Sequence, residues 1–509
     1  MRTKNAIKTS SASVFVFLVV NGLSFFSRRL FVQYLGFAVL GMHNVFLTII
    51  GTLNIVDLGI ASAIVFYLYR PLAEGDHETV SALIRYYRKV FAFISMVVLA
   101  LGLFFIPFLK IFTRNEFDLG IMLPYYLVFL IDVILSYVFS YNHALLMADQ
   151  KGHRTVLISG LFTSVGRILQ ILVLVYFSSY FLFVLTNSIA VLLGFIVISR
   201  HVSRHYPYIL GRQKELDSSL RRGIRAKTFA LAYHRVGNYL VTGTDNLIIS
   251  TTLGVTVLGH YSNFFMIYQI LLNIVFQVFA GTAAGFGNLL VEQDKSYARK
   301  VFFRVHFLGF FIFTVVMSGF LYLSTPLVEL WLGEPSLLNF DTVVALSMVL
   351  FFTGYSHVIG VFRASAGLFE PDKYIHVFIA VLNLIVSITL VQFFGVTGVL
   401  IGTLVSLVIK ELIVLPTIVF RHVFSSSPLE YWRTLFGHVL IGVLATFLLG
   451  FLLKFIQVET PVISFLVKAV SIPFFMGVVF YIVFRKSEEL QFYLQKVVFL
   501  LRKLTKRPV

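Results

Sequence analysis

The sequence predicts an all-α polytopic membrane protein with about 14 transmembrane helices, arranged as two six-helix copies of one unit followed by two further helices. Composition, the length of the apolar runs and an internal repeat support this prediction. The 509 residues are 58% hydrophobic and only 13% charged, and they include 56 phenylalanines. The charged fraction of a soluble domain is near 25%, so a chain of this composition belongs in a bilayer.

Apolar runs divide the chain into predicted spans, because a transmembrane helix needs about 20 apolar residues to cross about 30 Å of hydrocarbon. Fourteen runs of this kind lie at residues 12–36, 43–68, 89–109, 121–146, 155–175, 180–200, 228–250, 257–283, 301–323, 341–362, 375–394, 397–419, 434–455 and 462–484. A basic segment precedes the first run, as in a signal peptide. However, no small-residue cleavage site follows, and Arg28 and Arg29 interrupt the run, so it is interpreted as the first spanning helix.

An internal repeat relates the first part of the chain to the second. The Leu-Gly-x-x-x-Leu-Gly frame within residues 34–44 returns within residues 252–262, 218 positions later. A polar hinge between two apolar runs, residues 148–155, has a counterpart 219 positions later at residues 367–374. A duplicated apolar unit is typical of secondary transporters, whose substrate pathway runs between the repeats.

These patterns predict five segments along the chain. They are an N-terminal six-helix lobe (1–200), a basic cytoplasmic linker (201–227), a C-terminal six-helix lobe (228–420), two additional transmembrane helices (421–485) and a basic amphipathic cytoplasmic tail (486–509). The linker and the tail are rich in Lys and Arg, so both are expected to lie on the anionic inner leaflet.

Basic residues are distributed unevenly between the two sides of the predicted spans. With the N-terminus inside, the inside segments hold 32 of the 41 Lys and Arg residues, and the outside loops hold only Lys110, Arg114 and Lys454. Cytoplasmic loops of membrane proteins carry such an excess. We therefore expect a multi-pass membrane protein with both termini in the cytoplasm. The net charge of +18 then reports topology and not binding to nucleic acid.

Ten ionisable residues within the runs are the candidates for function. A charge at the bilayer centre costs from about 3 to more than 10 kcal/mol, so such residues normally face a protein interior or an aqueous cavity. The cations are Arg28, Arg29, Arg167, Arg235, Lys410 and Lys468, and the carboxylates are Asp57, Asp132, Asp245 and Glu411. The excess of cations favours an anionic substrate, and the planar fork of arginine suits phosphate oxygens.

Other interpretations of these ten residues stay open at this point. Each cation could instead pair with a buried carboxylate or extend to a membrane interface. The carboxylates are candidates for coupling to a proton or sodium gradient, or for balancing the charge of a neighbouring arginine. The histidines of the runs lie mostly near helix ends, where a structural role is expected.

Several classes of site are missing from the sequence. It contains no cysteine, which excludes disulfides and thiolate metal sites. It also lacks a Gly-x-x-x-x-Gly-Lys-Ser/Thr nucleotide loop, an HExxH metal motif and an ordered Ser/His/Asp arrangement. We therefore expect no catalytic residue, no metal site and no cofactor, and a protein that is not an enzyme.

Seven stretches of the sequence, in four groups, point to a family. They are Tyr34-Leu-Gly-Phe-Ala-Val-Leu-Gly41 with Asp57-Leu-Gly-Ile-Ala-Ser-Ala63, Leu68-Tyr-Arg-Pro-Leu-Ala-Glu-Gly-Asp76, Thr244-Asp-Asn-Leu-Ile-Ile249 with Leu253-Gly, and Arg363-Ala-Ser-Ala-Gly-Leu-Phe-Glu-Pro-Asp-Lys-Tyr374 with Gly395-Val-Thr-Gly-Val-Leu-Ile-Gly-Thr403. In this order and spacing, which span most of the chain, they resemble the Wzx-type polysaccharide flippases of the multidrug/oligosaccharidyl-lipid/polysaccharide exporter superfamily.

The resemblance implies two six-helix lobes around a central cavity that opens alternately to each side of the membrane. The implied cargo is an undecaprenyl-diphosphate-linked oligosaccharide repeat unit, flipped for a capsule, exopolysaccharide, O-antigen-like or teichoic polymer. Arg28 and Arg29, followed by Arg167 and Arg235, would hold the diphosphate, with Lys410 as a further buried cation. The implied partners are the lipid-linked substrate, the membrane, and the glycan polymerase and glycosyltransferases of the same pathway.

Two alternatives compete with this interpretation. A cation-coupled drug exporter of the same superfamily would prefer a carboxylate-rich cavity, against which the cationic excess argues. A polytopic polysaccharide polymerase would also bind lipid diphosphates through arginines. Such an enzyme would be expected to have a long extracytoplasmic loop and no two-lobe repeat.

Overall fold

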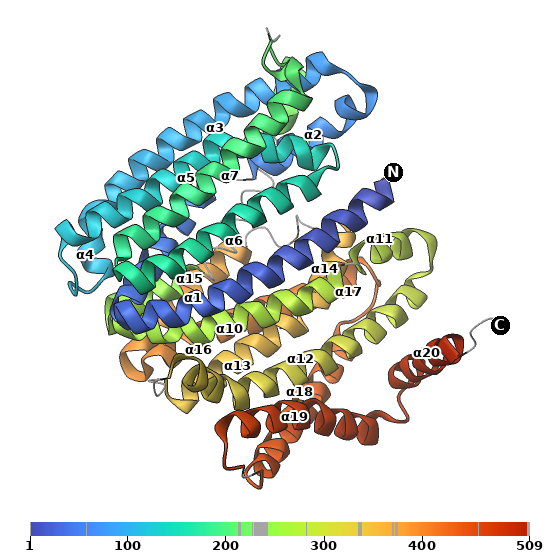
Figure 1. Ribbon diagram of the computed structural model, residues 1–509. Helices are drawn as coiled ribbons and strands as arrows, with labels where there is room; N and C mark the ends of the chain where they lie inside the picture. Colours follow the sequence, from blue (N-terminus) through green and yellow to red (C-terminus); the bar gives the residue numbers. More distant parts are fainter. Residues whose placement is uncertain are drawn as a thin grey trace. The chain divides into compact units, whose positions relative to one another are not determined.

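The computed structural model describes residues 2–57, 59–211, 215–225, 228, 243–280, 282–333, 338–368, 371, 375–456 and 458–505. Every regular element within these ranges is helical, and 12 of the helices there are long and apolar enough to cross a membrane (Figure 1). The predicted all-α class is therefore confirmed. These 12 helices match 12 of the 14 predicted spans. The run predicted at 43–68 is divided instead, because its residues up to Asp57 continue the first helix and those from Ile60 belong to the next helix, Ile60–Glu74. Most of the remaining span, 228–250, lies outside the described residues.

The chain divides into two compact units, Met1–Ser262 and Asn263–Val509. The helices of the first unit are α1 (Arg2–Leu53), α2 (Ile60–Glu74), α3 (His77–Phe105), α4 (Leu109–Phe112), α5 (Leu119–Ala148), α6 (Gly152–Phe177), α7 (Tyr180–His205), α9 (Asp245–Leu253) and the first residues of α10 (Val255–Ala280). Because α9 packs against α1, the unit ends beyond the predicted linker. The division of the chain into two six-helix lobes stays a prediction.

The second unit continues α10 and contains the remaining helices. They are α11 (Thr282–Glu292), α12 (Lys295–Leu332), α13 (Phe340–Tyr355), α14 (His357–Ser365), α15 (Ile375–Phe394), α16 (Val396–Leu407), a π-helix (Val408–Val414), α17 (Leu415–His422), α18 (Leu429–Leu453), α19 (Pro461–Phe484) and α20 (Glu488–Thr505).

Helix ends depart from the predicted spans mainly where polar residues continue a helix. The span predicted at 375–394 coincides with α15, whereas α3 begins at His77 and α12 begins at Lys295, several residues before their apolar runs. Apolarity marks the hydrocarbon thickness, and a helix can extend past it into the interface. For the same reason the predicted linker is partly helical, since α7 reaches His205 and residues 218–225 are also helical.

The predicted repeat has a direct structural counterpart in the backbone. Gly36 interrupts α1 with φ 79° and ψ 172°, and Gly254, 218 positions later, separates α9 from α10 with φ 100° and ψ 161°. This combination of angles is essentially restricted to glycine. The N-caps also correspond, because Asp76 precedes α3 and Asp294 precedes α12 at the same spacing. The repeat therefore specifies matching breaks and starts of helices.

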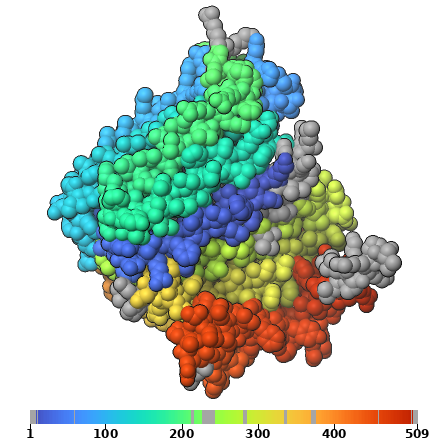
Figure 2. All heavy atoms as spheres, in the orientation of Figure 1, coloured from blue at the N-terminus to red at the C-terminus, as the bar shows by residue number. Residues whose placement is uncertain are grey.

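Apolar side chains cover the outer surface of the first unit. On α6 and α7, whose outer faces are in view in Figure 2, exposed large residues include Leu161, Ile168, Leu172, Ile189 and Leu193. A soluble protein rarely leaves a patch of this kind uncovered. These faces are suited to contact with lipid chains.

Candidate functional site

Two of the candidate arginines, Arg28 and Arg167, lie on neighbouring helices of the first unit. The first half of α1 runs along α6, and α6 packs against α7 (Figure 1). Glycines allow the close approach: a side chain at Gly160 would overlap Val16, and one at Gly166 would overlap Ala190. Small residues serve this purpose at helix contacts in membranes.

Arg28 projects from α1 into this region and is half-buried. Its Nη2 donates to Ser262 Oγ at 2.9 Å and to the Ser262 backbone carbonyl at 3.3 Å. The Ser262 hydroxyl donates in turn to the carbonyl of Gly259 at 2.8 Å, so its lone pairs can accept from the arginine. These contacts fix one edge of the guanidinium in place.

Arg167 lies on α6 within electrostatic range of Arg28. Its Nη1 donates to Gln170 Oε1 at 2.8 Å, and the amide nitrogen of Gln170 donates to the carbonyl of Phe183 at 2.9 Å. The Nε of Arg167 is buried, and within the part of the chain that the structure describes it has no hydrogen-bond partner. No carboxylate in that part lies within ion-pair distance of Arg167. Its charge therefore remains available to an anion.

His43 is a third ionisable side chain in this region. Its Nδ1 lies 3.1 Å from the Tyr180 hydroxyl, and both arginines are within electrostatic range of the ring. Phe31 and Phe183 lie edge-on or tilted against the imidazole, with ring centroids 5.8 and 6.2 Å away. The cationic group therefore consists of Arg28, Arg167, His43, Tyr180 and Gln170, which together we call the N-unit cation cluster.

The other predicted cations lie elsewhere. Arg29, next to Arg28 and about 100° around the helix, is exposed on the surface of the first unit. Arg235 lies outside the described residues. Lys410 belongs to the second unit, where its Nζ is 3.0 Å from a carboxylate oxygen of Glu411. The structure therefore groups Arg28 with Arg167 and pairs Lys410 locally.

The predicted carboxylates make local contacts. Asp57 accepts a hydrogen bond from the backbone nitrogen of Gly59 at 2.5 Å and closes the turn between α1 and α2. Asp132 on α5 accepts from the Ser188 hydroxyl of α7 at 2.6 Å. Asp245 is buried at the start of α9. Within the described ranges, no group of three or more His, Asp or Glu side chains is arranged to hold a metal ion.

Sequence reasoning did not identify His43, Gln170, Tyr180 or Ser262. Neutral polar residues occur throughout the predicted spans, so polarity alone does not single them out. A usable signal was the spacing of Gln170 and Arg167, three residues apart on one helix, which places the two side chains on the same face. The contacts of His43 and Ser262 depend on helices far apart in the sequence.

Comparisons with known proteins address the fold. No protein-family model and no curated protein matches the sequence. Among solved structures, the lipid II flippase MurJ in an inward closed conformation matches with a TM-score of 0.65 and 15% identity, over 94% of this chain and 99% of that one.

Two multidrug transporter structures of the MATE family match as well. An inward-facing MATE transporter of the MOP superfamily has a TM-score of 0.61 at 13% identity, over 79% of this chain and 97% of its own. The Vibrio cholerae MATE transporter VcmN has a TM-score of 0.56 at 14% identity, over 84% and 99%. The chain therefore has the fold found in MurJ and in MATE transporters.

Proposed function

We propose that the protein is a secondary transporter that flips an undecaprenyl-diphosphate-linked oligosaccharide repeat unit to the outer leaflet of a bacterial cytoplasmic membrane. The observation that carries this proposal is the N-unit cation cluster, in which Arg28 and Arg167 lie within electrostatic range of one another and no described carboxylate pairs with Arg167. Two neighbouring guanidiniums repel one another unless an anion lies between them. A diphosphate carries charge and oxygen geometry that suit both.

The lipid carrier supports the same proposal. A diphosphate headgroup cannot cross hydrocarbon without cationic shelter, because desolvating its charge is too costly. Its polyprenyl tail is apolar and can stay in the bilayer beside the exposed faces of α6 and α7. The fold is shared with MurJ, a lipid II flippase. Flipping of lipid II is thus one function carried out by a protein with this fold.

Export of cationic drugs is the second candidate function, since MATE multidrug transporters share the fold. The N-unit cation cluster argues against it, because like charges disfavour a cationic cargo. A polysaccharide polymerase is less favoured, as the neighbours in fold are transporters and flippases. The partners proposed are the polymerase and glycosyltransferases of the same polysaccharide pathway, and transport would draw on a proton or sodium gradient.

A deletion strain tests the transport function. Cells that lack the protein and have no second flippase should accumulate lipid-linked repeat units on the inner leaflet and lose the surface polymer. Complementation with wild type should restore the polymer, and a panel of flippase-deletion strains would narrow the glycan. Normal polymer in the clean deletion would refute the proposal.

Matched substitutions test the site. Arg167→Gln should fail to complement while the protein still accumulates in the membrane, because the charge that receives the phosphate is gone. Arg200→Gln, which removes an exposed arginine from neighbouring α7, should complement normally. Equal activity of the two variants would show that the N-unit cation cluster is not required for transport.

A further inference from the structure

The second unit contains a π-helix at an ionisable pair. Residues Val408–Val414 form it between α16 and α17, and they carry Lys410 and Glu411, whose side chains are 20% and 16% exposed. π-Helical turns are rare and occur frequently at functional sites, because they strain the regular ladder of hydrogen bonds. Trp432 of α18 steadies this one by donating from Nε1 to the carbonyl of Leu412 at 2.9 Å.

Buried histidines and tyrosines lie beside the π-helix. Tyr431 of α18 and His357 of α14 are both within electrostatic range of Glu411. The ring of His306, on α12, lies 5.2 Å from that of Tyr431 and 4.3 Å from that of Tyr355, measured between centroids. Tyr355 places its hydroxyl 3.1 Å from Nδ1 of His438. Polar groups thus continue from the π-helix to His438.

The cluster has polar atoms that the protein leaves unmatched. Both ring nitrogens of His306 and the hydroxyl of Tyr431 are buried without a hydrogen-bond partner in the residues that the structure covers. His306 is 1% exposed and Tyr431 is fully buried. Leaving such groups unpaired is costly, so native proteins satisfy them with ordered water. Water between these side chains would connect them.

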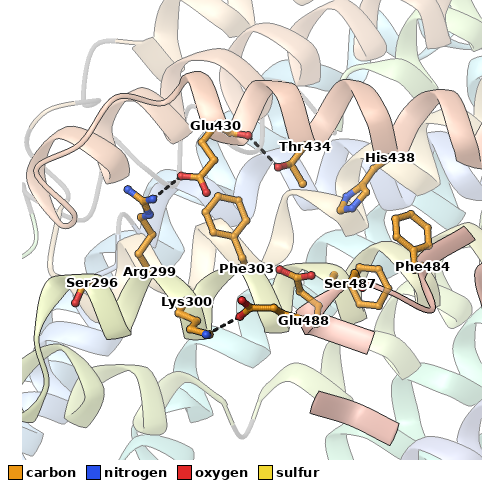
Figure 3. Close-up of a pocket in the computed structure, with 12 residues that line it drawn as sticks. Ser296, Arg299, Lys300, Phe303, Glu430, Thr434, His438, Phe484, Ser487 and Glu488 are labelled. Carbon is orange, nitrogen blue, oxygen red and sulfur yellow. Dashed lines mark hydrogen bonds and ion pairs between the residues drawn. The ribbon is translucent and has the colours of Figure 1, made fainter. Parts of the chain in front are cut away.

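A surface pocket reaches the far end of this cluster. The pocket has a volume of about 450 Å³ and lies between α12, α18 and the start of α20. Figure 3 shows the Arg299–Glu430 ion pair at one end of it, and His438 and Phe484 at the other. The ion pair of Lys300 with Glu488 also lines it. His438 therefore borders both the pocket and the buried cluster.

We propose that His438, Tyr355, His306 and Tyr431 form a proton relay that loads Glu411 from this pocket. The proposal deepens the proposed function, on which it rests, by assigning the coupling ion and its site. A pocket water gives a proton to His438, whose Nδ1–H passes one to Tyr355, and the hydroxyl proton moves on through water at His306 and Tyr431. One proton leaves the pocket and one is gained by the Glu411 carboxylate.

Protonation of Glu411 breaks its ion pair with Lys410 and changes the charge at the π-helix. The elements packed against the π-helix carry Tyr355 on α13, His376 on α15, and Arg421 and His422 at the end of α17. His357 of α14 lies within electrostatic range of Glu411. The ammonium of Lys410 already pairs with the carboxylate of Glu411. The imidazoles and phenols beside this pair are groups that can transfer protons. A sodium ion would instead need several free oxygen ligands. The chemistry therefore favours protons.

Tryptophan fluorescence can test the relay without any lipid substrate. The chain has two tryptophans, so Trp331→Phe leaves Trp432, which is bonded to the π-helix, as the sole reporter. In purified protein in nanodiscs, its emission should change sigmoidally over the pH range in which the protein stays folded, because protonation of Glu411 breaks the ion pair of the π-helix to which Trp432 is bonded. Failure of the flipping assay would leave this readout unaffected, so the two proposals fail separately.

Substitutions can distinguish the proton acceptor of the relay, Glu411, from the residues that carry the proton to it. Glu411→Gln should abolish the transition, and Lys410→Gln should move it to higher pH because the ammonium that favours the ionised carboxylate is removed. Tyr355→Phe and His306→Phe should keep its midpoint but slow it about tenfold or more after a pH jump, since each removes a proton carrier. Glu74→Gln, which breaks the exposed ion pair with Arg70 on α2 away from the pocket, is the control and should behave as wild type.

Three results would overturn the relay. They are a wild type whose emission is flat across this range, a transition that persists in Glu411→Gln, and a response to sodium at constant pH in place of a response to pH. Unchanged rates in both Tyr355→Phe and His306→Phe would remove these two residues from the path. If Glu411→Gln does not fold, Lys410→Gln still tests the proposal. A shift of the fluorescence transition to higher pH in that variant is expected only if the ion pair of Lys410 with Glu411 is responsible for the transition.

Discussion

Gly41 and Gly259 lie 218 positions apart, and each packs its α-carbon against the backbone of the other's helix. A β-carbon at Gly41 would overlap the carbonyl oxygen of Val255, and one at Gly259 would overlap the carbonyl oxygen of Phe37. Phe37 and Val255 are themselves related by the same spacing. The repeat therefore builds a symmetric glycine contact inside the first unit, where the second half of α1 meets the start of α10.

This contact predicts that Gly41→Ala and Gly259→Ala destabilise the protein by similar amounts, about 1–3 kcal/mol or more, since backbone atoms cannot move aside cheaply. Gly22→Ala on the same helix is the control, because its β-carbon would meet nothing within 4 Å. Thermal unfolding in one detergent would compare the three variants. A Gly41→Ala protein as stable as Gly22→Ala would contradict the close contact.

Much of the helical architecture could be predicted because bilayer thickness sets the length of apolar runs. The span at 375–394 coincides with α15, and the tail predicted from residue 486 contains α20, which starts at Glu488. The Leu-Gly-x-x-x-Leu-Gly frame coincides with the breaks at Gly36 and Gly254, which it did not predict as breaks. The sequence does not reveal that α1 continues directly past Gly36, because a one-residue kink leaves no polar segment between two spans.

The candidate site was predictable only in part. Charge within a span identified Arg28 and Arg167, and a rotation of about 100° between neighbours required that Arg28 and Arg29 differ in environment, as they do. The pairing of Lys410 with Glu411 at 3.0 Å is one of the alternatives left open by the sequence, in which a cation pairs with a carboxylate of the same runs. The π-helix that carries both residues was not expected, because no local signal in the sequence predicts it.

The kink at Gly36 gives a second prediction. A β-carbon there would meet nothing within 4 Å, so Gly36→Ala should act only through the backbone, whose φ of 79° is unfavourable for alanine. We expect a loss of transport that exceeds the loss of membrane abundance, because straightening would turn the second half of α1. Immunoblotting beside the complementation assay checks this. Wild-type transport by Gly36→Ala would show that the break is dispensable.

Topology can be tested cleanly because the chain contains no cysteine. From the distribution of basic residues, Thr460→Cys before α19 should react with an impermeant thiol reagent added outside, and Ser218→Cys in the predicted cytoplasmic linker should not. Both positions are exposed, so access to reagent is set by the membrane. After permeabilisation both should react, which serves as the control. The reverse labelling pattern would invert the predicted orientation.

The most informative substitutions concern Arg28. Ser262 holds one edge of its guanidinium at 2.9 and 3.3 Å, and Arg167 stands within electrostatic range. If the pair receives a diphosphate, Arg28→Ala should abolish transport at nearly normal membrane abundance. Arg28→Lys should recover only part of the activity, because a point charge replaces a bidentate fork. Arg29→Ala, at the exposed neighbour, is the matched comparison and should retain more transport than Arg28→Ala.

A structural role of Arg28 makes the opposite prediction. Removing an arginine that neutralises a buried carboxylate strands that charge at a cost of about 3–5 kcal/mol, so Arg28→Ala would then fail to accumulate. Ser262→Ala distinguishes the two cases further. It removes the hydroxyl that positions the guanidinium but not the charge, so it should weaken transport without lowering abundance. Parallel loss of abundance and activity in Arg28→Ala, or full activity of the Arg28→Ala/Arg29→Ala double variant, would exclude a substrate-binding role, because a residue that holds the diphosphate must affect transport independently of folding.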